Sequence, residues 1–114
     1  MAKQAEINIR VQLDDKQVPE KIFWQASDAD FEGEKAAESF NLAVWDADAK
    51  TSLTIDLWTK ELTVQDMNMF FYQKLVKMAE TYGRSTPFKE TAELIASFAD
   101  QFAQKVEDES QKMS

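Results

Sequence analysis

The stretch SLTIDLWTKELTVQDMNMFFYQKL, residues 52–75, contains the change of pattern that decides the fold. In its first part every second residue is apolar, at Leu53, Ile55 and Leu57, and this period of two is typical of a strand with one exposed face. After Thr63 the apolar residues recur every three or four positions, which is the period of an amphipathic helix. The chain is therefore predicted to pass from strand to helix at this point.

The first helix has signals at both of its ends. Thr63 is a favourable N-cap, because its hydroxyl oxygen can accept a hydrogen bond from an N–H of the first turn. Gly83 is the residue type that most often follows the last residue of a helix. A helix is therefore predicted from about Val64 to Tyr82.

A second helix follows after a short connection. Thr86 and Pro87 are typical of a helix start, because proline is well tolerated in the first turn. The apolar pattern continues to about Glu107. Residues 108–114 are polar and include acidic groups that oppose the helix dipole, so we expect them to form a frayed tail.

Alternation with a period of two marks the part of the chain before these helices. Residues 5–13 alternate strictly, and residues 20–26 are predicted to pair with them as a hairpin. Residues 38–46 and 51–58 are predicted to form a second hairpin with one apolar face. The polar segment 27–35 is predicted to be a loop that joins the two hairpins.

The predicted fold is α+β with the order ββββαα. In it a four-stranded antiparallel sheet, made of two hairpins, is followed by two helices that pack on one of its faces. A chain of 114 residues has room for one ordinary core. We therefore expect residues 1–107 to form a single domain.

The composition excludes several classes of function. Thirteen Lys and Arg stand against 21 Asp and Glu, giving a net charge of −8, and no basic cluster is present, so binding to nucleic acid is not expected. No apolar run is long enough to cross a membrane, and the first residues lack the pattern of a signal peptide. We expect a cytoplasmic protein without membrane insertion.

The residues needed for common catalytic and metal sites are scarce. The chain contains no His and no Cys, which removes Ser-His-Asp triads, cysteine nucleophiles and ordinary zinc sites. The sequence DADFEG, residues 28–33, begins like a calcium loop, but Ser39 stands where the loop needs its bidentate acid. We therefore expect no catalytic residue, no metal and no cofactor, and the protein is predicted not to be an enzyme.

Two sets of apolar residues are candidates for a protein interface. Trp45 and Trp58 are out of phase with the apolar residues of their strands, so both are predicted on the opposite face of the sheet. Met69, Tyr72 and Val76 lie off the main stripe of the first helix and face either the second helix or another subunit. We expect a homo-oligomer and favour the Trp pair as its contact.

Three segments carry a resemblance to a known family: VPEKIFW (18–24), AVWDADAK (43–50) and SLTIDLWTKELTVQDMNMFFYQKLVKMAETYGRST (52–86). With the Phe- and Ala-patterned last helix they resemble the GldC family of gliding-motility proteins over about residues 6–106. The resemblance implies a small accessory component of bacterial gliding that has no assigned catalytic activity. It brings no catalytic or metal residues with it.

The predicted order of elements is also similar to that of the export chaperone SecB. That similarity concerns topology alone, and a fold does not define a function. The sequence thus predicts a non-catalytic protein that binds other proteins, in the gliding apparatus. The alternative is a holdase that binds unfolded or exported chains.

Overall fold

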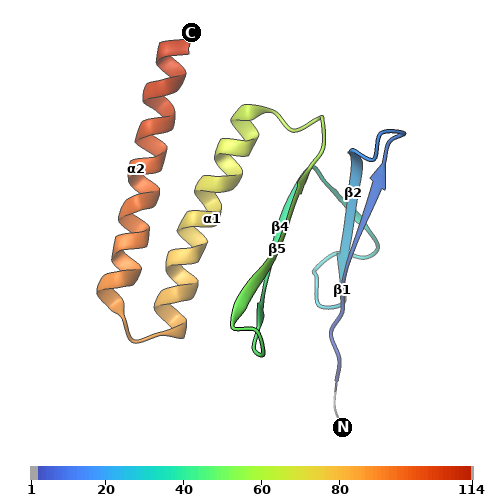
Figure 1. Ribbon diagram of the computed structural model, residues 1–114, viewed down its shortest axis with the longest axis horizontal. Coiled ribbons are helices and arrows are strands. Elements are labelled where there is room, and N and C mark those ends of the chain that lie inside the picture. The colour runs from blue at the N-terminus through green and yellow to red at the C-terminus, as the bar shows by residue number, and fades with distance from the viewer. Residues whose placement is uncertain (1–2, 114) are drawn as a thin grey trace. The chain divides into compact units, whose positions relative to one another are not determined.

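The computed structural model describes residues 3–113, and its chain divides at Leu62 and Thr63 into two compact units. All the strands belong to the first unit, the strand unit, and both helices belong to the second, the helix unit (Figure 1). The predicted order of strands before helices is therefore confirmed. The expectation that the helices pack on one face of a sheet stays a prediction.

The first sheet has the order β1-β2-β3 and is antiparallel throughout. Its strands are β1 (Ile7–Leu13), β2 (Pro19–Ala26) and β3 (Lys35–Ala37). One face is apolar because the strict alternation of β1 puts its isoleucines beside the apolar residues of β2, and Ile22 at its centre is 1% exposed. The first predicted hairpin is confirmed by this pairing.

The turn between β1 and β2 is built around Asp14. Its carboxylate oxygen Oδ1 accepts hydrogen bonds from the backbone N–H groups of Lys16, at 2.8 Å, and Val18, at 3.0 Å. Gln17 adopts a left-handed backbone with φ of 65°, which the tight turn requires. The other oxygen, Oδ2, accepts from Lys60 Nζ at 2.7 Å, so the same side chain ties the turn to the segment after β5.

The second sheet is the hairpin of β4 (Ser39–Asp46) and β5 (Thr51–Trp58). The turn between them is held by Asp46, whose Oδ1 accepts from the N–H groups of Asp48 and Ala49. Lys50 takes the left-handed conformation that closes the turn, with φ of 56°. The register is regular along the whole hairpin, so the second predicted hairpin is also confirmed.

The prediction of one four-stranded sheet is wrong, because the strands form a three-stranded sheet and a separate two-stranded sheet. The extended run from residue 35 to residue 46 changes its partner at Glu38, where the backbone bends. Before the bend β3 pairs with β2, and after it β4 pairs with β5. Strand β3 lies at the end of the predicted loop, and three residues are too few to show an alternating pattern.

Helix α1 (Val64–Ser85) begins where the change of period predicts. The hydroxyl oxygen of Thr63 accepts a hydrogen bond from the N–H of Asp66 at 3.0 Å, which confirms the N-cap. The predicted end of the helix is wrong, because Gly83 lies inside α1 and the C-cap is Thr86. Both the backbone N–H and the hydroxyl of Thr86 donate to the Tyr82 carbonyl oxygen, which ends the helix without glycine.

Helix α2 (Lys89–Met113) lies antiparallel beside α1 (Figure 1). Its start is preceded by Thr86, whose hydroxyl oxygen accepts from the N–H of Phe88 at 3.2 Å. The helix continues to Met113, beyond the predicted end near residue 107, so residues 108–113 are helical in the structure. Polar contacts one turn apart support this last part, as where Gln104 donates to Asp108 at 3.0 Å.

Replacing Thr63 with Ala should destabilise the protein by about 1 kcal/mol, because the N–H of Asp66 loses its acceptor. For a domain of this size the melting temperature should fall by roughly 4–8 °C. Thr81→Ala is the matched control, since Thr81 is an exposed residue inside α1 and Ala is a better helix former. Thermal unfolding followed by circular dichroism measures both, and equal midpoints for the two variants would contradict the cap.

Candidate functional site

The two helices approach each other closely at the end where they are connected. A Cβ atom placed on Gly83 would lie 3.4 Å from the Cβ of Ala92. Farther from the connection Ala79 and Ala99 are both buried, at 8% and 1% exposed. Small residues at these positions let the backbones of α1 and α2 come together, which is why a glycine inside a helix is tolerated here.

At the opposite end the helices leave an apolar groove between the start of α1 and the end of α2. Its volume is about 570 Å³. Tyr72 and Phe102 are both half-buried there and supply its aromatic lining. The lining residues are Val64, Gln65, Asn68, Met69, Tyr72, Phe102, Ala103, Val106, Glu107 and Ser110.

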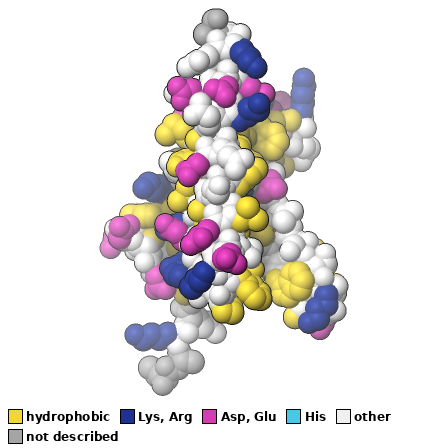
Figure 2. Space-filling view, turned by 90° about the vertical axis from the view of Figure 1, so that its left-hand side faces the viewer, with side chains coloured by type: hydrophobic (Ala, Val, Ile, Leu, Met, Phe, Trp, Pro, Cys, Tyr) yellow, Lys and Arg dark blue, Asp and Glu magenta, His cyan; other side chains and the backbone are white. Residues whose placement is uncertain are grey.

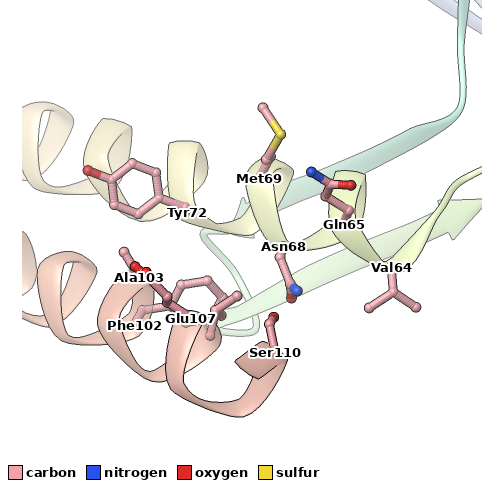
Figure 3. Close-up of a pocket in the computed structure, with 10 residues that line it drawn as sticks. Val64, Gln65, Asn68, Met69, Tyr72, Phe102, Ala103, Glu107 and Ser110 are labelled. Carbon is pink, nitrogen blue, oxygen red and sulfur yellow. The ribbon is translucent and has the colours of Figure 1, made fainter. Parts of the chain in front are cut away.

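The groove combines an apolar floor with polar groups at its rim. In Figure 3 the side chains of Asn68 and Ser110 point toward one another from the two helices, and Met69 points away from α2. Met69 is 52% exposed, so its flexible thioether is available to a partner. Apolar grooves with a few polar groups at the edge are typical of binding sites for other molecules.

Hydrophobic side chains reach the surface along both flanks of a strip of charged groups in Figure 2. The exposed large apolar residues of the helix unit include Phe71 and Met78 of α1 and Leu94 and Phe98 of α2. Projected on the two antiparallel helices, all four fall on one side of the helix pair. The helix unit therefore has a broad apolar face in addition to the groove.

The structure divides the predicted set Met69, Tyr72 and Val76. Met69 and Tyr72 line the groove, whereas Val76 is half-buried and does not line it. The sequence pattern allowed this set to face either the second helix or another subunit. In the structure Tyr72 lies on the side of α1 that faces α2. The interface role of these residues stays a prediction. The sequence pattern did not identify Phe102 as a groove residue, because the packing of two helices depends on contacts between residues far apart in the chain.

Trp45 and Trp58 lie on one face of the β4–β5 hairpin, where the alternation of the two strands also places them. Trp45 is directly opposite Ser52, and Trp58 is directly opposite Ser39, so the two rings stand at opposite ends of the hairpin. Six residues of strand separate them, which is roughly 20 Å. Both are exposed, at 61% and 56%, but they do not form one continuous patch within the hairpin.

The continuous apolar surface of the hairpin is its other face. Three cross-strand pairs make it up, and its exposed members are between 41% and 57% exposed. The pairs are Phe40 with Leu57, Leu42 with Ile55, and Val44 with Leu53. The sequence pattern predicted that this face packs against the helices as part of the core. That packing stays a prediction.

The clearest electrostatic features are two ion pairs in the strand unit. Arg10 donates two hydrogen bonds to Glu34, at 2.7 and 3.1 Å, which raises the pKa of the guanidinium and lowers the pKa of the carboxyl group. The hydrogen bond from Lys60, followed by those from Val18 and Lys16, lowers the pKa of Asp14 to about 2. Each shift favours the charged form of its group, as expected of ion pairs that support structure rather than transfer protons.

Residues 3–113 contain no group of three or more acidic, His or Cys side chains that could hold a metal ion. Within the same part of the chain neither helix has the length and apolar character needed to cross a membrane. The expectations of no metal, no cofactor and no catalysis stay predictions.

Comparison with known protein families assigns the chain to one family. The family of gliding motility-associated proteins described as GldC-like matches residues 19–108. This covers most of the chain, including all of α1 and α2 as far as residue 108, so the protein belongs to the GldC-like family. A search of curated proteins and a search of solved structures each returned no match.

The Asp14–Lys60 ion pair should make the stability of the protein depend on pH under acidic conditions. Because folding lowers the pKa of Asp14 from 3.8 to about 2, its stabilisation is complete above about pH 4 and is lost as the pH falls toward 2. The difference in urea midpoint between the native protein and Asp14→Asn should therefore shrink between pH 5 and pH 2. Asp15→Asn, at the exposed neighbour, serves as control and should show no such change; a constant difference for Asp14→Asn would contradict the assignment.

Proposed function

We propose that this GldC-like protein is a non-catalytic accessory component of the bacterial gliding apparatus and that it acts by binding another protein. Membership of the family supports the link to gliding motility. The groove between α1 and α2 is the observation that supports a binding role, because its exposed Met69 and half-buried Tyr72 and Phe102 are residue types enriched at protein interfaces. A cytoplasmic location and self-association belong to the same proposal.

The chemistry of the described residues supports a binding protein over an enzyme. The chain has no His and no Cys, and its two strong ion pairs lie in the strand unit, whereas the groove lies in the helix unit. A general acid or base needs a group whose pKa is tuned toward neutral pH. The pKa shifts of Asp14 and Glu34 go in the opposite direction.

A holdase that binds unfolded chains is the second candidate, and the same groove favours it. Exposed Met and aromatic side chains suit a surface that must accept many sequences. The two candidates differ in selectivity. An accessory subunit binds one or two folded proteins, and a holdase binds many unrelated unfolded ones.

The test is affinity capture from the native cell with the unmodified protein and with Met69→Lys. Met69 is 52% exposed, so the added charge should alter the groove without disturbing the fold. We expect a component of the gliding apparatus to be captured by the unmodified protein and to be reduced at least tenfold with Met69→Lys. Gln73→Lys is the matched control, because Gln73 is also exposed on α1 but does not line the groove.

Three other outcomes decide against parts of the proposal. Capture of many unrelated unfolded proteins, lost with Met69→Lys, would favour the holdase. Equal capture by both variants would remove the groove as the binding surface. Capture of no protein of the gliding apparatus would contradict the proposed function.

A further inference from the structure

The outer edge of β5 offers backbone hydrogen-bonding groups that no strand among residues 3–113 satisfies. The Thr59 N–H donates to the Glu38 carbonyl oxygen at 2.9 Å. This bond fixes which cross-strand pairs of the hairpin are hydrogen-bonded and which are not. Residues 51, 53, 55 and 57 therefore bond to β4, and Ser52, Thr54, Asp56 and Trp58 turn their N–H and C=O groups outward. A long edge of this kind is a template for pairing with another strand.

The rest of the same chain cannot supply that strand. The strands described among residues 3–113 all lie in the strand unit, and of these β5 pairs only with β4. The helix unit consists of α1 and α2, whose backbone groups are bonded within each helix. A two-stranded hairpin on its own is marginally stable in water, and a third strand or a covering layer is needed. Within residues 3–113 no further strand is left to pair with β5, so a strand that extends this sheet would come from another chain.

We infer that β5 pairs antiparallel with β5 of a second copy of this protein, about a two-fold axis at Ile55. This inference deepens the proposed self-association and rests on it. The two hairpins then form one four-stranded sheet in the order β4-β5-β5-β4. A two-fold interface of this kind uses the same surface on both chains.

The sequence of β5 is self-complementary in this register. Ile55 faces Ile55 of the second copy, and Leu53 faces its Leu57, so the apolar face continues across the junction. On the other face Asp56 lies opposite Thr54 of the second copy. Shifting the axis to Asp56 would oppose two carboxylates, so the charge pattern favours the axis at Ile55.

The other edges of the strand unit are less suitable for the same pairing. Full-length pairing of β1 with itself would centre on Arg10 and oppose two guanidinium groups, each already bound to Glu34. Strand β3 has only three residues. Strand β4 begins directly after the bend at Glu38, so the start of its outer edge lies where the chain leaves its pairing with β2.

The pairing also brings tryptophans together that one hairpin keeps apart. Trp58 would lie opposite Ser52 of the second copy, and that serine is paired with Trp45 of its own hairpin. The two rings, one from each copy, then stand two strand spacings apart, which is about 10 Å, instead of roughly 20 Å. Both are exposed in the single chain and are large enough to meet above the serine.

The chain contains no Cys, so one introduced cysteine can form a disulfide only between two copies. In the proposed register the Cα atoms of the two Ile55 residues are about 4.5 Å apart, within the range that a disulfide spans. We expect Ile55→Cys to give a crosslinked dimer on a non-reducing gel after mild oxidation. Leu42→Cys is the matched control, because Leu42 is the cross-strand partner of Ile55 and is similarly exposed, at 41% against 52%.

The Leu42 residues of the two copies would be three strand spacings apart, about 14 Å, which is too far for a disulfide. Crosslinking of Leu42→Cys in place of Ile55→Cys would show pairing through β4 and would overturn the inference. Equal crosslinking of both variants would overturn it as well, because it would indicate random collision.

Two proline variants test the same edge without cysteine. Thr54→Pro removes an N–H on the outer edge of β5, and Ala43→Pro removes one on the outer edge of β4, directly across the hairpin. We expect light scattering to give a dimer for the native chain and for Ala43→Pro, and a chain of 13.1 kDa for Thr54→Pro with its circular dichroism unchanged. A dimer that persists in Thr54→Pro, or a native chain that is monomeric at micromolar concentration, would overturn the inference.

These results are independent of the capture experiment. Loss of β5 pairing leaves the groove of the helix unit intact, so a failure of this inference would leave the proposed gliding partner untouched. Failure to capture a gliding component would, in turn, leave the crosslinking result valid.

Discussion

The hydrogen bond from the Thr59 N–H to the Glu38 carbonyl oxygen marks the point on which the arrangement of the strand unit depends. It lies where the extended run from β3 to β4 bends and exchanges β2 for β5 as its neighbour. Thr59 is 3% exposed, although it follows the last residue of an exposed strand. This buried contact closes the ladder between β4 and β5 and fixes which backbone groups of β5 turn outward.

A similar constraint governs the helix unit, where residue size decides the distance between the helices. Gly83 and Ala92 allow a close approach near the connection, whereas the larger Tyr72 and Phe102 line the groove at the other end. Its position away from the connection leaves it accessible at the ends of α1 and α2.

The charges of the protein agree with a role in binding. Its net charge of −8 opposes association between copies through non-specific apolar contacts, and its ion pairs Arg10–Glu34 and Asp14–Lys60 lie in the strand unit. Membership of the GldC-like family associates the chain with gliding motility. Under the proposed function, the exposed tryptophans of the hairpin and the half-buried aromatic residues of the groove are contacts with other proteins.

The sequence by itself determined the strand and helix types, the two hairpins, the N-cap at Thr63 and the family. These features depend on neighbouring residues, since periodicity and capping are local properties of the chain. Tertiary structure decided that the extended run bends at Glu38, that Gly83 serves close helix packing instead of ending α1, and that Tyr72 and Phe102 line one groove. Each of these depends on contacts between residues far apart in the sequence, and local patterns carry no information about which distant surfaces will meet.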